Sequence, residues 1–167
     1  MIHVCNLDLI DQTIKNTGAK YLVSLINKDM MPNTPATIKS DNHLKLAFND
    51  ITEPMNGYVN VQDSDIAKLI NFLENWNLQA PILFHCWAGV SRSTAGAFIA
   101  ANFAKGAGYE QEIAHKLREV APFSTPNKLV VSLADNYLKR GGKMQDAIDA
   151  IGRGSYTHSG IPFMLPI

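Results

Sequence analysis

The chain has 167 residues, of which 46% are hydrophobic and 18% are charged, and its 15 Lys and Arg residues balance its 15 Asp and Glu residues. A chain of this length and composition can bury one sizeable core. Because neither charge sign is in excess, broad electrostatic binding to nucleic acid or to an anionic membrane is not expected, and any anion must be recognised locally.

The first part of the chain alternates expected strands and helices. Apolar runs predict buried strands over residues 2–5 and 21–26, and alternating apolar and polar residues predict a half-buried strand over 43–48. A helix is expected over residues 9–17, where Gly18 ends it. Residues 28–42 and 49–63 contain proline or glycine among polar residues and are expected to be loops.

The rest of the chain is mostly helical in prediction. Ser64 or Asp63 would cap a helix that runs to about Trp76 with its apolar residues on one face. Residues 81–85 predict a strand buried on both faces, and residues 93–104, which are apolar nearly all round, predict a central buried helix. Further helices are expected over 110–120, 127–138 and 144–151. The tail, residues 152–167, is rich in Gly and Pro and is expected to lie extended over the surface.

This order of elements predicts an α/β fold. We expect a central, mostly parallel, twisted sheet of about four to five strands with helices on both faces. No internal repeat and no low-complexity segment interrupts the chain, and no boundary stands out. The prediction is therefore a single domain over residues 1–167.

The chain has only two cysteines, Cys5 and Cys86, which gives no disulfide framework and suits a reducing compartment. The N-terminus shows no signal peptide, and the longest apolar stretch, residues 95–104, is far short of a membrane span. We therefore expect a soluble, cytoplasmic protein. Cys5 is expected to be a small core residue; the alternative is a resolving thiol for an oxidised Cys86.

The segment from His85 to Ser93 reads His-Cys-Trp-Ala-Gly-Val-Ser-Arg-Ser and joins an expected strand to an expected helix. Such a tight loop can turn successive backbone N–H groups toward one centre, and the helix N-terminus adds its own free N–H groups. Gly89 allows a backbone angle that a Cβ would forbid, and the planar fork of Arg92 can grip two phosphate oxygens. The loop is predicted to bind a phosphate through residues Trp87, Ala88, Gly89, Val90, Ser91 and Arg92.

Cys86 stands where this loop begins. The positive surroundings favour its thiolate, which would lie in line for attack on phosphorus. Ser93 can donate a hydrogen bond to the sulfur and help it leave in a second step. His85, at the strand end, is expected to brace the loop rather than transfer protons. These residue types and their spacing predict a cysteine-dependent phosphate-ester hydrolase.

The pattern His-Cys-x-Ala-Gly-x-Ser-Arg-Ser resembles the signature of the protein tyrosine phosphatase superfamily, in particular its dual-specificity-like branch. The resemblance spans roughly residues 20–138 and implies that Cys86 is the nucleophile, that Arg92 binds the phosphate and the transition state, and that a phosphocysteine forms. Thr125-Pro126-Asn127 resembles the Ser-Pro-Asn of such phosphatases, which implies that Asn127 supports the loop.

The resemblance also implies a general acid, an Asp on a loop some thirty-odd residues before the cysteine. Asp50 stands 36 positions before Cys86 and directly follows the strand expected over residues 43–48. Glu53, Asp63 and Asp65 are the alternatives, although the last two suit the start of a helix. Asp50 is the predicted acid.

The side chains of Trp87, Ala88 and Val90 add no positive charge to the loop, which favours a singly phosphorylated substrate such as phosphotyrosine in a protein. Phosphoserine, phosphothreonine and a small phosphomonoester remain open, as does the oligomeric state. A catalytically silent phosphate-binding module and a sulfurtransferase-like loop are the alternative functions. The other histidines show no ligand spacing, so no metal and no cofactor are expected.

Overall fold

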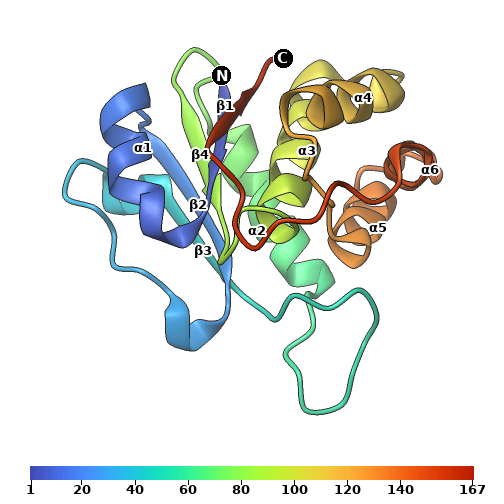
Figure 1. The fold of residues 1–167 in the computed structure, drawn as a ribbon, viewed down its shortest axis with the longest axis horizontal. Helices are drawn as coiled ribbons and strands as arrows, with labels where there is room; N and C mark the ends of the chain where they lie inside the picture. The colour runs from blue at the N-terminus through green and yellow to red at the C-terminus, as the bar shows by residue number, and fades with distance from the viewer.

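A computed structural model describes residues 1–167 and shows one five-stranded sheet with helices on both faces (Figure 1). The strands are β1 (Ile2–Cys5), β2 (Tyr21–Ile26), β3 (His43–Ala47), β4 (Ile82–His85) and β5 (Phe163–Leu165). They lie in the order β3-β2-β4-β1-β5, and β1 to β4 run parallel to one another. The predicted α/β class and mostly parallel sheet are confirmed.

The C-terminal segment differs from the prediction. Instead of lying wholly extended over the surface, it adds β5 antiparallel to β1, with Phe163 opposite Val4 and Leu165 opposite Ile2. Leu165 is fully buried. A three-residue strand is too short to show an alternating pattern, and the prolines on either side of it favour a loop prediction. The signal for β5 is therefore a tertiary one, the unpaired edge of β1.

All six expected helices are present, and their ends fall within two residues of the prediction. They are α1 (Ile10–Thr17), α2 (Asp63–Glu74), α3 (Arg92–Lys105), α4 (Glu110–Val120), α5 (Lys128–Tyr137) and α6 (Lys143–Ile151). α1 lies on one face of the sheet and the other five lie on the opposite side (Figure 1). Short 3-10 turns at Lys28–Met30 and Ser40–Asn42 interrupt a segment that was predicted as loop only.

The central helix α3 is buried from Arg92 to Asn102. At Gly96 it approaches the sheet so closely that a Cβ would lie 2.8 Å from Cδ1 of Phe84. This contact needs a residue without a side chain. α3 packs against β1, β2 and β4, and it begins with Arg92 and Ser93 a short loop after the end of β4.

The carboxyl ends of β2, β3 and β4 meet at one edge of the sheet, as they must in parallel strands. Asn27 follows β2, Phe48 and Asp50 follow β3, and Cys86 follows β4. The connection from β3 to α2 leaves this edge as a long loop (Figure 1). None of the helices has the length and apolar character needed to cross a membrane.

Candidate active site

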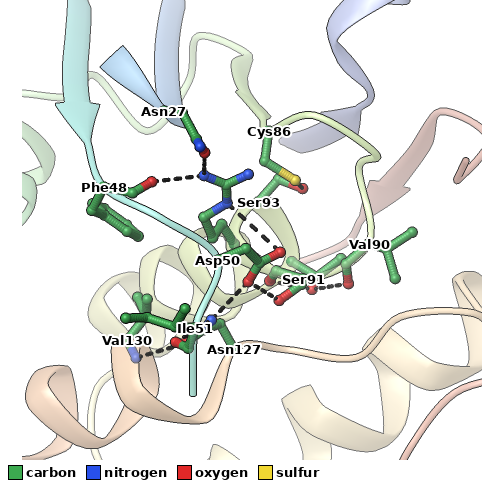
Figure 2. Close-up of polar contacts among 12 residues, drawn as sticks. Asn27, Phe48, Asp50, Ile51, Cys86, Val90, Ser91, Ser93, Asn127 and Val130 are labelled. Carbon is green, nitrogen blue, oxygen red and sulfur yellow. Dashed lines mark hydrogen bonds and ion pairs between the residues drawn. The ribbon is translucent and has the colours of Figure 1, made fainter. Parts of the chain in front are cut away.

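Cys86 directly follows β4 and is buried. Its Sγ lies 3.1 Å from Oγ of Ser93, which is in the first turn of α3 (Figure 2). Ser93 is fully buried, and the sulfur is the hydrogen-bond partner of its hydroxyl. The structure thus brings together the predicted nucleophile and the residue predicted to donate to it.

The first half of the loop, after Cys86, is fixed through its backbone carbonyls. The N–H of Leu7 donates to the carbonyl of Trp87 at 3.1 Å, and the N–H of Gly160 donates to that of Ala88 at 2.8 Å. Gly160 is buried, and a Cβ there would lie 2.5 Å from Cε2 of Phe123. The C-terminal segment therefore approaches the loop at a position where only glycine fits.

The second half of the loop is fixed in the same way by the segment before α5. The N–H of Thr125 donates to the carbonyl of Val90 at 2.9 Å, and the N–H of Asn127 donates to that of Ser91 at 3.3 Å. The hydroxyl of Thr94 also donates to both carbonyls. The carbonyls of Trp87, Ala88, Val90 and Ser91 therefore point away from the inside of the loop, toward the surrounding segments of the protein.

The backbone N–H groups from Trp87 to Ser93 donate to no acceptor within the chain. Because the carbonyls of the same peptides accept bonds from the surrounding segments, these N–H groups face the other side of the loop. Gly89 has φ +71, and a Cβ there would lie 2.8 Å from the backbone N of Asn6. The loop therefore has the unpaired N–H groups of an anion nest, and it begins at Cys86.

Arg92 is buried and anchored at one end of its guanidinium. Its Nη1 donates to Oδ1 of Asn27 at 2.8 Å and to the carbonyl of Phe48 at 2.7 Å (Figure 2). Its Nε makes no hydrogen bond, although it lies 3.7 Å from Oδ2 of Asp50. The anchored end fixes the guanidinium plane, and Nε is left buried without a hydrogen-bond acceptor.

Asp50 lies beside the loop, three residues beyond the last residue of β3. Its Oδ1 accepts hydrogen bonds from Oγ of Ser91 at 2.7 Å and from Nδ2 of Asn127 at 2.8 Å (Figure 2). The same Asn127 amide donates to the carbonyl of Ile51, and its Oδ1 caps α5 by accepting from Val130. Asn127 therefore connects the segment of Asp50, the loop that follows Cys86, and α5.

The other candidate acids lie in different settings. Asp65 accepts from the backbone N–H of Gln62 at the start of α2 and lies 3.8 Å from Lys68, and Asp63 is the first residue of that helix. Both fit the helix-start role that the sequence suggests for them. Glu53 is exposed and makes no hydrogen bond or ion pair. Among the four carboxylates, only Asp50 contacts the loop.

A buried polar chain lies behind Cys86. Oγ of Ser24 is within hydrogen-bond distance of Nε2 of both His85 and His43, and Nδ1 of His43 lies 2.8 Å from Oγ1 of Thr34. Nδ1 of His85 lies 3.4 Å from the carbonyl of Cys86. If that nitrogen donates, Ser24 donates to His85 and accepts from His43, and every contact is satisfied by two neutral rings.

The two buried histidines of this hydrogen-bonded group make the stability of the protein depend on pH. Burial lowers the pKa of His85 and that of His43 to about 4. The unfolded chain takes up both protons near pH 6.5 and the folded protein does not, so the free energy of unfolding should fall from pH 6.5 toward pH 4. The fall should reach up to about 1.4 kcal/mol per pH unit for each histidine. Urea unfolding at several pH values measures it.

Two variants serve as the test and the control for that experiment. His43→Asn should remove part of the pH dependence, because it removes one of the two buried rings. His115→Gln replaces an exposed histidine and should leave the dependence unchanged. An unfolding free energy that stays flat between pH 7 and pH 5 would contradict the neutral, buried state of both rings.

Several residues at the site were missed by sequence reasoning. Asn27 and the carbonyl of Phe48 orient Arg92, Ser24 binds His85, and Asn6 holds the C-terminal segment by donating to Oγ of Ser159 and to the carbonyl of Gly160. Asn27 could have been found, because polar residues at the carboxyl ends of parallel strands often form the site. The backbone contacts leave no signature in the sequence.

Trp87 is exposed, and the two cysteines are free thiols. Trp87 is 59% exposed and so is not packed into the helices. Cys5 is buried in the apolar cluster under α1, and burial raises the pKa of its thiol to about 12. Both cysteines are free. No group of three or more His, Cys, Asp or Glu side chains is arranged to hold a metal ion.

Comparison with known proteins bears on the fold. No protein-family profile matches the sequence, and no curated protein sequence matches it. The structure is similar to a crystal structure of the Cydia pomonella PTP-2 phosphatase, with a TM-score of 0.62 and 22% sequence identity over 81% of this chain and 84% of that chain. It is also similar to a crystal structure of DUSP15, with a TM-score of 0.55 and 17% identity over 90% of this chain and 89% of that chain. The chain therefore shares the fold of these proteins.

Proposed function

We propose that this protein is a cysteine-dependent phosphatase that hydrolyses phosphate monoesters through a phosphocysteine intermediate. The observation that carries the proposal is the loop from Trp87 to Ser93, whose backbone N–H groups have no acceptor within the chain while its carbonyls are bound outward. A phosphoryl group in this nest would lie above the sulfur of Cys86. The fold, shared with the PTP-2 phosphatase, supports the same reading.

In the first step the thiolate of Cys86 attacks phosphorus, and the bond from phosphorus to the ester oxygen breaks. Asp50, protonated, gives its proton to the departing oxygen. The nest and the Nε edge of Arg92 hold the charge that builds up on the equatorial oxygens. The alcohol or phenol leaves, and a phosphocysteine remains.

In the second step water attacks phosphorus, and the bond from phosphorus to sulfur breaks. Asp50, now a carboxylate, takes a proton from the water. Ser93, with Oγ 3.1 Å from Sγ, donates to the sulfur as it leaves as a thiolate. Inorganic phosphate departs and the starting enzyme is restored.

The substrate class follows from the loop side chains. Trp87, Ala88 and Val90 carry no charge, so the cation provided by the loop and its helix is that of Arg92. One cation with a ring of N–H groups suits a single phosphate dianion. We therefore propose phosphotyrosine in proteins as the main substrate, with phosphoserine and phosphothreonine as further substrates. We also propose that the chain is a single catalytic domain that works in the reducing cytoplasm.

The direct test measures phosphate release from p-nitrophenyl phosphate, a phosphotyrosine peptide, the matched phosphoserine peptide and an inositol bisphosphate. Hydrolysis of the two aryl phosphates, inhibited competitively by vanadate, is expected. Absence of turnover on all four compounds would overturn the proposal. Binding of the phosphopeptides without turnover would identify the protein as a silent phosphate-binding module instead.

The role of Asp50 has its own prediction. Asp50→Asn keeps the shape and the hydrogen bond from Ser91 but cannot give up a proton, so kcat should fall about 100-fold. The loss should be larger for phenyl phosphate than for p-nitrophenyl phosphate, because phenol is the poorer leaving group. Steady-state kinetics on both esters measures this difference.

Glu53→Gln is the matched control for that variant, since Glu53 is an exposed carboxylate of the same loop that makes no hydrogen bond or ion pair. It should leave both rates unchanged. If Asp50→Asn lost little activity, the acid would have to be sought at Asp63 or Asp65.

A further inference from the structure

A hollow of about 370 Å³ adjoins the phosphate loop. Its polar wall includes Thr52, Ser91, Thr125, Asn127, Lys128 and Arg153. Ser91 belongs to the loop, and Asn127 binds Asp50, so the hollow and the proposed catalytic site share one wall. A substrate whose phosphate lies in the loop would bring its neighbouring groups over this hollow.

The charge of the hollow is positive. Lys128 and Arg153 line it, and none of its lining residues is acidic. Nζ of Lys128 is engaged by Oδ1 of Asp149 at 2.6 Å, so its charge is largely balanced. Arg153 is exposed and makes no ion pair or side-chain hydrogen bond within the chain. It is therefore the cation of the hollow that is available to a ligand.

The backbone on both sides of Arg153 is held in place. Arg118 donates to the carbonyls of Ile151 and Gly152 at 2.6 and 2.8 Å, and the N–H of Gly154 donates to Oγ1 of Thr125 at 3.1 Å. A Cβ on Gly154 would lie 2.5 Å from the backbone C of Phe123, so this contact also requires a glycine. The Arg153 side chain thus projects from a fixed point and is itself unpaired.

We propose that this hollow is a specificity subsite for a second anionic group, a carboxylate or a phosphate, on a residue close to the phosphotyrosine of a peptide substrate. The inference rests on the proposed function and extends it to the choice of substrate. The guanidinium of Arg153 would bind two oxygens of that group, and the hydroxyls of Thr52 and Thr125 offer further hydrogen bonds.

The test uses three phosphotyrosine peptides of one length, with neutral, glutamate or phosphoserine neighbours. The wild-type protein should prefer the two anionic peptides in kcat/KM by about five- to tenfold, and the preference should shrink as salt is raised. The glutamate and phosphoserine peptides distinguish a carboxylate from a phosphate ligand. Arg153→Glu should abolish or reverse the preference.

Lys15→Glu is the matched control, because it makes the same change of charge on α1, on the opposite face of the sheet. It should keep the wild-type preference. Equal kcat/KM for all three peptides in the wild-type protein, or the same loss of preference in Lys15→Glu as in Arg153→Glu, would overturn the inference.

A binding experiment separates this inference from the proposed function. Fluorescence anisotropy of the same labelled peptides on Cys86→Ser protein measures the preference without turnover. If p-nitrophenyl phosphate is not hydrolysed but anionic peptides bind more tightly through Arg153, the phosphatase assignment fails and the subsite stands. If that ester is hydrolysed and the peptides bind equally, only the subsite fails.

Discussion

Replacing Cys86 by serine is expected to lower kcat for p-nitrophenyl phosphate by about 10⁴-fold or more, because an alcohol without a nearby base is a far weaker nucleophile than a thiolate. The substitution exchanges sulfur for oxygen and leaves the loop carbonyls with their donors. Affinity for a phosphopeptide should therefore persist. Stopped assays of phosphate release and a binding titration measure the two effects separately.

The second cysteine supplies the control. Cys5→Ala removes a thiol that lies in the apolar cluster under α1, and it should leave kcat within about twofold while lowering stability by roughly 1 kcal/mol. A Cys86→Ser rate within tenfold of the wild-type rate would remove Cys86 from the mechanism. A large loss of activity in a folded Cys5→Ala protein would show that the two thiols act together.

Arg92→Lys is expected to lower kcat/KM by about 10³-fold even though the charge is kept. The guanidinium is anchored through Nη1 to Asn27 and to the carbonyl of Phe48, and its Nε makes no hydrogen bond within the chain, so it is the proposed phosphate donor. A lysine has one ammonium group and cannot satisfy the anchor and a phosphate together. Weaker inhibition by vanadate should accompany the loss.

Because Arg92 is buried, that variant needs a check on folding. Arg140→Lys alters another partly buried arginine, which donates to the carbonyl of Asn102 far along α3, and should leave kcat/KM nearly unchanged. Thermal unfolding of both variants shows whether each is folded. A folded Arg92→Lys protein with wild-type kcat/KM would contradict the proposed role of the fork.

The fold could be predicted largely because its main elements carry strong local signals. The apolar runs that became β1, β2 and β4 and the nearly uniform apolar helix α3 need no tertiary information. The strand β5 does, since three residues between prolines acquire their structure only from the open edge of β1. The sequence shows the segment but not the edge that it meets.

The site residues also differ in whether the local sequence could predict them. Cys86, Arg92 and Ser93 lie in one contiguous motif. Asp50 was chosen because the family resemblance implies an Asp some thirty-odd residues before the cysteine and Asp50 follows a strand at that spacing. The residues that meet in the structure were therefore largely expected. The supports that act through backbone groups could not be predicted. Examples are the carbonyl of Phe48 and the N–H of Gly160. Every residue type has a backbone carbonyl, and every type except proline has an N–H, so these groups become specific only in three dimensions.

Most of the backbone donors that hold the carbonyls of the loop from Trp87 to Ser91 come from distant residues, namely 7, 125, 127 and 160, so segments near both ends of the described chain hold this loop. Contacts between segments this far apart form late in folding, after the helices and the nearest strand pairs. During refolding, the circular dichroism of the helices should therefore recover before enzymatic activity does. Activity would then report the docking of residues 159–165 onto the sheet.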